Sequence, residues 1–193
     1  MNSERRRLAA ELLAVSRAYD AVQPDRVLRF RNLEPDTAEI LGVIVRARDA
    51  GRLLELGTSN GYSTMWLADA AENCGAALVS VDTDPARTAM ARENLRRAAL
   101  HPELRTEDAQ DTLRNSAKNY WSFIFLDAER SQYASYWSDL LRVLAPGGLL
   151  AIDNVLSHAT EVEQLTALIV AEPRVTSAVV PVGAGLRLVV RDT

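Results

Sequence analysis

Three things are scarce in this sequence: cysteine, an excess of charge of one sign, and long apolar runs. Cys74 is the only cysteine among 193 residues, which rules out a disulfide within the chain and fits a reducing compartment. The 22 basic and 26 acidic residues leave a formal net charge of -4, so the chain offers no basic footprint for nucleic acid and no polybasic surface for anionic lipid. No apolar run approaches the roughly 20 residues that cross a bilayer. We therefore expect a cytoplasmic protein that binds a small molecule.

The start of the chain is basic, but it does not have the form of a signal peptide. Glu11, Arg17 and Asp20 interrupt the apolar stretch that such a peptide requires, so residues 1–20 are interpreted as an amphipathic helix. A second helix is expected to begin near Pro35. The length and the 48% apolar content fit one domain. Within it, residues 1–51 would form a helical segment that contributes to the substrate side, and residues 52–193 the core.

From Arg52 onward, short apolar runs alternate with longer segments of helical period, which is typical of a parallel α/β sheet. The expected strands are 52–56, 77–82, 104–107, 122–127 and 148–153. The expected helices between them are 62–71, 85–99, 109–116 and 133–144, the last one stopped by "APGG". After a further helix at 160–171, two β-rich runs joined at Gly183–Gly185 predict a closing hairpin.

The stretch "LLELGTSNGYST", residues 53–64, places the carboxylate of Glu55 at the tip of a strand and two glycines in the turn that follows. In an open parallel sheet, ligands bind beyond the carboxyl ends of the strands, where N–H groups of the next helix point outward. The dinucleotide-binding motif G-x-G-x-x-G has a middle glycine that lets a pyrophosphate approach the backbone, and no glycine stands between Gly57 and Gly61. The carboxylate is instead suited to a ligand ammonium group, and the loop N–H groups are suited to a ligand carboxylate.

Asp82 ends the second expected strand, 21 positions after Gly61, the spacing at which an acidic residue accepts hydrogen bonds from a ribose. An amino acid, a ribose and no pyrophosphate together indicate S-adenosylmethionine. The alternative is that the glycines only make a tight turn and that Asp82 caps the helix beginning at Pro85. That alternative leaves Glu55 unexplained.

Four stretches, "LLELGTSNGYST", "VSVDTDP", "FIFLDAER" and "LAPGGLLAIDN", resemble the class I S-adenosylmethionine-dependent methyltransferases, over about residues 33–193. Within that class the chain is similar to the catechol and caffeoyl-CoA O-methyltransferases. The resemblance implies a homodimer and a Rossmann-like α/β fold, with a seven-stranded, mostly parallel sheet in the order 3-2-1-4-5-7-6, its last strand antiparallel and helices on both faces. The cofactor-binding residues that it implies are Glu55, Gly57, Thr58, Ser59, Gly61, Tyr62, Ser63, Asp82, Ala109, Gln110 and Asp127.

Two more expected strands end in oxygen ligands: Asp127 closes "FIFLD", and Asp153 and Asn154 close "GLLAIDN". Two carboxylates and an amide carbonyl would make an all-oxygen site suited to Mg²⁺ or a similar cation rather than to Zn²⁺. In the family that the chain resembles, the matching residues bind a divalent cation that chelates vicinal oxygens of the acceptor. The alternatives are that these residues cap helices or bond loop amides, and that Asp127 serves the cofactor without a metal.

Arg130 stands in "DAERSQY" where many members of that family carry a lysine. A guanidinium keeps a pKa above roughly 12 and is a poor base. We therefore assign the catalytic roles to Asp127 and Arg130, with Arg130 stabilising an oxyanion or binding a substrate carboxylate. The alternative for Arg130 is a surface salt bridge to Glu129 or Asp127. His158 is interpreted as a solvated loop residue.

The sequence thus predicts an O-methyltransferase that moves the methyl group of S-adenosylmethionine to a hydroxyl of a small catechol-like acceptor, assisted by a divalent cation. Three alternatives stay open. The first is a metal-independent methyltransferase that acts on another small molecule. The second is an S-adenosylmethionine-binding module without turnover. The third and most distant is a nicotinamide oxidoreductase, which the missing middle glycine disfavours.

Overall fold

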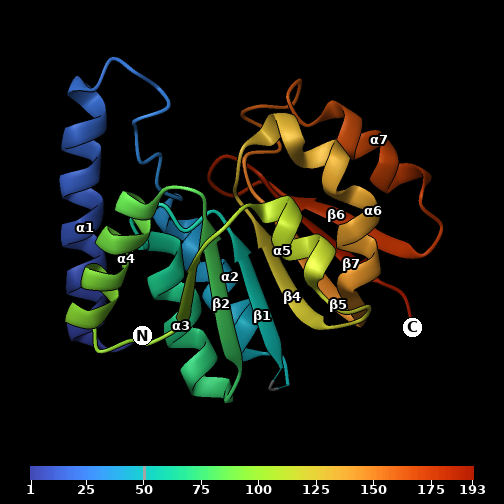
Figure 1. Ribbon diagram of the computed structural model, residues 1–193, viewed down its shortest axis with the longest axis horizontal. Helices are drawn as coiled ribbons and strands as arrows, with labels where there is room; N and C mark the ends of the chain where they lie inside the picture. The colour runs from blue at the N-terminus through green and yellow to red at the C-terminus, as the bar shows by residue number, and fades with distance from the viewer. Residues whose placement is uncertain (50) are drawn as a thin grey trace.

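Seven strands form one sheet in the order β3-β2-β1-β4-β5-β7-β6, with helices on both faces (Figure 1). The structure is a computed structural model that describes residues 1–49 and 51–193. The strands are β1 (Arg52–Leu56), β2 (Ala77–Asp82), β3 (Glu103–Thr106), β4 (Trp121–Leu126), β5 (Leu144–Ile152), β6 (Val175–Val180) and β7 (Leu186–Arg191). The helices are α1 (Ser3–Val22), α2 (Pro35–Arg46), α3 (Tyr62–Cys74), α4 (Pro85–Arg97), α5 (Ala109–Asn115), the short 3₁₀ turn η1 (Arg130–Gln132), α6 (Tyr133–Val143) and α7 (Glu163–Ala171).

The strand pairing confirms the predicted topology. β1 pairs in parallel with β2 and β4, while β2 pairs in parallel with β3 and β4 with β5. β7 runs antiparallel to both β5 and β6, which is the predicted closing hairpin. The observed bounds of β1 and β2 equal the predicted ones, and β3 and β4 each begin one residue earlier than predicted. The carboxyl ends of five parallel strands therefore meet at one edge of the sheet.

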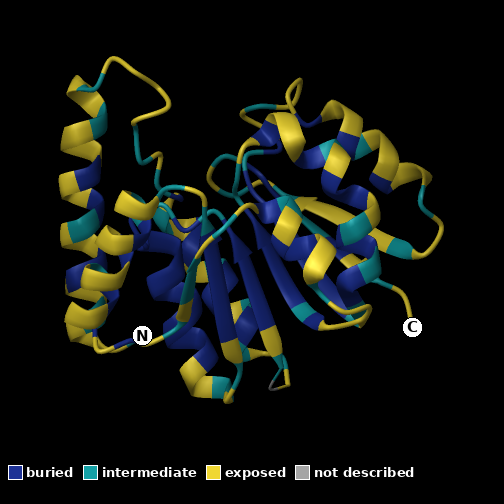
Figure 2. Ribbon diagram, in the orientation of Figure 1, coloured by how far each residue is buried: buried dark blue, intermediate teal, exposed yellow. Residues whose placement is uncertain are grey.

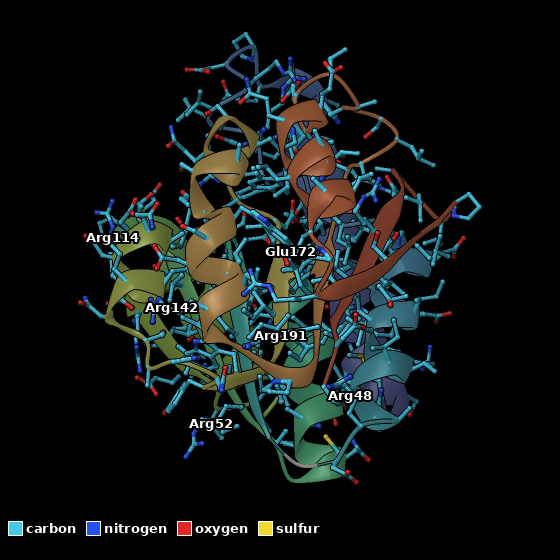
Figure 3. All side chains as sticks on the ribbon, turned by 90° about the vertical axis from the view of Figure 1, so that its right-hand side faces the viewer. Arg48, Arg52, Arg114, Arg142, Glu172 and Arg191 are labelled. Carbon is cyan, nitrogen blue, oxygen red and sulfur yellow. The ribbon has the colours of Figure 1, made fainter. Side chains whose placement is uncertain are left out.

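The prediction that "APGG" separates a helix from a strand was wrong. β5 begins at Leu144, which pairs with Trp121, and the ladder resumes with Leu149 opposite Phe123. The residues between bulge out, because proline has no N–H to give to a ladder. Two arginines hold the bulge from distant segments (Figure 3): Arg48 donates to the carbonyl oxygen of Gly147 at 3.0 Å, and Arg191 donates to that of Leu144.

Alternate residues of the central strands face opposite layers of the molecule. Leu53 and Phe123 belong to the apolar cluster packed by α1, α2 and α3, whereas Leu54 and Ile124 belong to the cluster packed by α5, α6 and α7. All four side chains are at most 2% exposed. The central strands are correspondingly buried throughout most of their length (Figure 2), since helices cover both faces. This double burial gives the strand ends a rigid base.

The predicted amphipathic helix at the start of the chain is confirmed as α1, which stands beside α4 at one edge of the molecule (Figure 1). It buries Leu8, Ala9 and Leu13 and leaves its other side to solvent. From its end, residues 23–34 lead back to α2, and we call this segment the N-terminal strap. No helix within the described ranges 1–49 and 51–193 has both the length and the apolar character needed to cross a membrane.

Candidate active site

A cleft of about 430 Å³ opens where β1, β2, β3 and β4 end. Its lining is drawn from the N-terminal strap, from the turn after β1, from the segments after β2 and β3, and from residues 127–136 after β4. Nine of the sequence-predicted site residues line it. They are Gly57, Thr58, Ser59, Tyr62, Ser63, Asp82, Ala109, Asp127 and Arg130. The chemistry of the site therefore lies at the edge that the sequence indicated.

Both glycines of the turn after β1 are required by close backbone contacts. Gly57 has φ +111°, and a Cβ placed on it would lie 2.1 Å from the carbonyl oxygen of Asp127. Gly61 has φ +87° and precedes α3, where a Cβ would lie 3.1 Å from the backbone of Ala91 in α4. These contacts join the turn to β4 on one side and to α4 on the other. The conformation of the turn is thus fixed by its contacts with β4 and α4.

Asp82 faces the cleft and also holds the turn after β1. Its Oδ2 accepts the N–H of Ser59 at 2.7 Å, and its Oδ1 accepts the N–H of Asp84 at 2.9 Å. The suggested capping of α4 by Asp82 is wrong, because Asp84 is the residue whose side chain accepts from the N–H groups of Ala86 and Arg87. Each carboxylate oxygen of Asp82 accepts one of these hydrogen bonds, and an oxygen with two lone pairs can accept another from a ligand.

Glu55 is fully buried beneath the turn and is not among the residues that line the cleft. Its two carboxylate oxygens accept hydrogen bonds from the hydroxyls of Ser63 (2.6 Å), Ser80 (2.6 Å) and Thr64. Burial raises the pKa of Glu55 to about 7, although the three hydroxyls act in the opposite direction. Thr58 extends this network through a 2.6 Å hydrogen bond between its hydroxyl and that of Ser80. The structure thus brings Glu55 to the back of the loop rather than to the cleft surface.

The wall after β3 is made by Ala109 and by Asp108, which the sequence reasoning missed. Asp108 caps α5 by accepting the N–H of Gln110 at 2.7 Å. The side chain of Gln110 does not line the cleft, since its amide donates to Asp139 at 2.9 Å. The signal for Asp108 was present: an acidic residue lies directly between a strand and a helix at the ligand-binding edge.

Asp127, Asp153 and Asn154 come together at the ends of β4 and β5, as predicted. The amide nitrogen of Asn154 donates to Asp127 Oδ1 at 3.2 Å and to Asp153 Oδ2 at 3.0 Å. Asp153 is 3% exposed, and its Oδ1 is buried without a hydrogen-bond partner among the described residues. Two carboxylates and an amide make up this cluster; no group of three or more His, Cys, Asp or Glu side chains fit to hold a metal occurs in the described ranges.

Both carboxyls of this cluster hold their protons more strongly than usual. Burial and then the charge of Asp127 raise the pKa of Asp153 to about 7. Burial raises the pKa of Asp127 to about 6, even though the positive charges of Arg31 and Arg130 lower it. A bound cation would lower both pKa values again, because it favours the charged form of each carboxyl.

Arg130 is 7% exposed and lines the cleft beside Asp127. Its Nε donates to Glu161 at 2.7 Å, in the loop after β5. The suggested salt bridge to Glu129 or Asp127 is therefore wrong, since the partner comes from a segment 31 positions further along the chain. A buried arginine with one half-exposed partner is a costly arrangement unless something else uses its charge.

The N-terminal strap covers one side of the cleft, although the sequence predicted a helical segment over residues 1–51 and no strap. Asp20 accepts the N–H groups of Phe30 and Arg31, both at 2.8 Å. Arg87 of α4 donates to the carbonyl oxygens of Val27 (2.6 Å) and Arg29 (3.1 Å). These four hydrogen bonds fix the path of the strap, so its side chains form part of the lining.

The sheet order, the glycine turn after the first strand and the acidic residue at the end of the second define the class I S-adenosylmethionine-dependent methyltransferases, which confirms the predicted resemblance. The sequence profile of the O-methyltransferase family matches residues 17–192. The chain belongs to that family.

Similar proteins agree with this assignment. The solved O-methyltransferase from Bacillus cereus in complex with SAH is 28% identical, with a TM-score of 0.80 and a match that covers 96% of this chain and 90% of that one. The catechol O-methyltransferase of Niastella koreensis is 34% identical over 130 residues, which are 65% of this chain and 58% of the relative. That of Mycobacterium tuberculosis is 31% identical over 147 residues, 75% of this chain and 64% of the relative. These two matches thus span less than two thirds of the relatives' own length.

Proposed function

We propose that this chain transfers the methyl group of S-adenosylmethionine to a hydroxyl of a small, catechol-like aromatic acceptor, assisted by a divalent cation. The observation that carries the proposal is the pair Asp127 and Asp153, whose raised pKa values and unpartnered buried oxygen lie beside the cleft. Relatives named catechol O-methyltransferase support the acceptor class.

The donor would bind at the ends of β1, β2 and β3. The N–H group of Ser63, in the first turn of α3, suits its carboxylate. Asp127 suits its ammonium group, and the free lone pairs of Asp82 suit its ribose hydroxyls. Ala109 and Asp108 would border the adenine. Glu55 acts behind the loop, where it holds the hydroxyls of Ser63 and Ser80 in place.

The reaction needs little from the protein beyond placement. The bond between the sulfonium and its methyl carbon breaks, a bond from that carbon to the acceptor oxygen forms, and the hydroxyl proton passes to water or a base. Holding donor and acceptor in line can supply on the order of 7 to 11 kcal/mol of the barrier. The strand ends and the strap, which four hydrogen bonds hold in place, would provide that placement.

Asp127, Asp153 and Asn154 are the residues that would hold the cation. Their donor set is all oxygen once the Asn154 amide turns its Oδ1 toward the carboxylates, and it suits Mg²⁺ or a similar hard ion. Such an ion would lower the pKa of the acceptor hydroxyl. The orphaned Oδ1 of Asp153 is the feature of this chain that such an ion would satisfy.

The test is methyl transfer to catechol, followed as S-adenosylhomocysteine and methylated product by mass spectrometry, with and without EDTA. We expect chelation to abolish turnover and added Mg²⁺ to restore it. Binding of Mn²⁺, followed by electron paramagnetic resonance, gives a readout that does not depend on turnover. Full activity after EDTA would remove the metal from the proposal.

One observation favours a second candidate, a metal-independent methyltransferase. A buried carboxyl whose pKa is raised to about 7, as in Asp153, is poised to act as a general base near neutral pH. Activity that survives EDTA but is lost in Asp153→Asn would support this candidate. S-adenosylhomocysteine binding without any methylated product would instead indicate a binding module without turnover. The homodimer also stays a prediction, testable by light scattering.

A further inference from the structure

Positive charge gathers at the acceptor end of the cleft from two separate segments. Arg26 and Arg31 lie in the N-terminal strap, whereas Arg130 follows β4. Burial and then the charges of Arg130, Arg26 and Arg31 lower the pKa of His158, in the loop after β5. Arg31 and Arg130 also act together on Asp127, and both line the cleft. Two arginines from separate segments, Arg31 and Arg130, therefore line the same cleft.

Arg130 has hydrogen-bonding capacity to spare. Its Nε is used by Glu161, but Nη1 and Nη2 make no hydrogen bond to any described residue, and neither is a fully buried atom. The side chain is 8% exposed, so its orientation is held by packing and by the pair with Glu161. Two parallel N–H donors at the edge of a cleft match the two oxygens of a carboxylate.

Arg31 is presented by an unusual backbone. Its φ is +51°, in the left-handed region that a residue with a side chain seldom adopts. Asp20 stabilises this conformation by accepting the N–H groups of Phe30 and Arg31. The side chain of Arg31 makes no hydrogen bond to a described residue. A strained residue with an unused guanidinium at a binding cleft indicates a functional constraint.

We propose that the acceptor carries a carboxylate, on its aromatic ring or on a short side chain, and that Arg130 binds it while Arg31 closes over it from the strap. This inference rests on the proposed function. A guanidinium cannot accept the acceptor's proton, but it binds a planar carboxylate in a bidentate fashion. Glu161, Asp127 and Asp153 lie around the same arginine, so a single negative charge fits this position better than the double charge of a phosphate.

The experiment compares kcat/KM for matched acceptors: 3,4-dihydroxybenzoate, its neutral methyl ester, catechol and 3,4-dihydroxyphenylphosphonate. We expect the benzoate to exceed the ester by about 10- to 100-fold, the size of one charge-assisted pair, and to exceed the phosphonate as well. In Arg130→Gln and Arg31→Gln the ratio of benzoate to ester should fall, most in Arg130→Gln. A general loss of turnover cancels in this ratio. The matched control is Arg114→Gln, whose exposed side chain lies on α5 away from the cleft lining and should leave the ratio unchanged.

Glu161→Gln provides a test of opposite sign. Removing the competing carboxylate beside Arg130 should raise the ratio of benzoate to ester, whereas a merely structural ion pair would lower turnover of both acceptors equally. A wild-type ratio near one, with the ester well methylated, overturns the inference and leaves the proposed function standing. A phosphonate that outperforms the benzoate overturns the choice of a carboxylate. No product from any acceptor overturns the proposed function itself.

Discussion

The two ends of the cleft satisfy their carboxylates in opposite ways. At the ends of β1 and β2, Glu55 receives three hydroxyls, and Asp82 receives two backbone N–H groups. At the ends of β4 and β5, Asp127 and Asp153 share one amide, and an oxygen of Asp153 has no described partner. The hydrogen bonds of Glu55 and Asp82 thus hold the turn after β1 in its conformation. The pair Asp127 and Asp153 instead keeps an oxygen that a bound ligand could satisfy.

This difference explains why similar residue types serve different purposes. Burial raises the pKa of Glu55 and of Asp153 to about 7 in each case. For Glu55 three hydroxyls act against this rise, whereas for Asp153 the negative charge of Asp127 is the largest cause after burial and adds to the rise. A buried carboxyl that the protein does not compensate is a better indicator of a ligand site than a buried carboxyl as such.

The largest loss of stability is expected from Gly57→Ala, because Gly57 lies against the backbone of Asp127 where the two ends of the cleft meet. Its Cβ would meet the carbonyl oxygen of Asp127 at 2.1 Å, in a backbone conformation with φ +111°. The left-handed conformation costs about 1–2 kcal/mol and overpacking adds about 1–3 kcal/mol, so the free energy of unfolding should fall by about 2–5 kcal/mol. Urea denaturation measures this. Gly147→Ala is the control, because it has φ +71° but only a side-chain methyl at 3.9 Å. Equal losses in both variants would contradict the argument.

Asp153→Asn should affect only the acceptor end. Turnover of catechol with Mg²⁺ should fall by at least about 10- to 100-fold, the size associated with losing a metal-site partner. The affinity for S-adenosylhomocysteine, measured by calorimetry, should stay that of the wild type. The exposed Asp111 supplies the control variant Asp111→Asn. If Asp153→Asn weakened S-adenosylhomocysteine binding as much as turnover, the two ends would not be separable.

Asp82→Ala should weaken binding of the cofactor and leave binding of the metal unchanged. The loss of a ribose contact and of the bond to the N–H of Ser59 should weaken S-adenosylhomocysteine binding by about 1–3 kcal/mol. Mn²⁺ binding at Asp127 and Asp153 should be unchanged, since no hydrogen bond links Asp82 to either carboxyl in the described residues. Unaltered affinity for S-adenosylhomocysteine would count against the assignment of Asp82.

The last expected effect is the pH dependence that Glu55 contributes to stability. Its folded pKa of about 7 lies above the unfolded value of about 4.3, so the folded state holds the proton more strongly. This stabilisation is complete below the unfolded pKa and is lost as pH rises through 7. The free energy of unfolding of the wild type relative to Glu55→Gln should therefore fall between pH 5 and pH 8 in metal-free buffer. A difference that does not change with pH would show that Glu55 keeps the same charge throughout.

Much of the fold could be predicted because each strand is a short apolar run with clear boundaries. β1 and β2 have the predicted bounds, and the carboxyl ends of neighbouring strands bring Asp127 and Asp153 together as their sequence positions indicated. The start of β5 could not be predicted in this way. Proline and glycine normally end an element, and here Arg48 and Arg191 hold them inside a strand from distant parts of the chain.

The parts of the site that the sequence did not reveal depend on contacts between distant residues. The hydroxyls that enclose Glu55 come from α3 and from β2, and no spacing rule links Ser80 to that carboxylate. The N-terminal strap reaches the cleft only because Asp20 and Arg87 fix its path. Local periodicity shows where strands end, but it does not show which loop folds over them.

The close approach of Gly57 to the backbone of Asp127 has a consequence for evolution and engineering. With no side chain between them, the turn after β1 and the tip of β4 have one fixed separation. If the turn receives the donor as proposed, exchanging the strap or the loop after β5 would change the acceptor that fits, while the distance between donor and acceptor would stay the same.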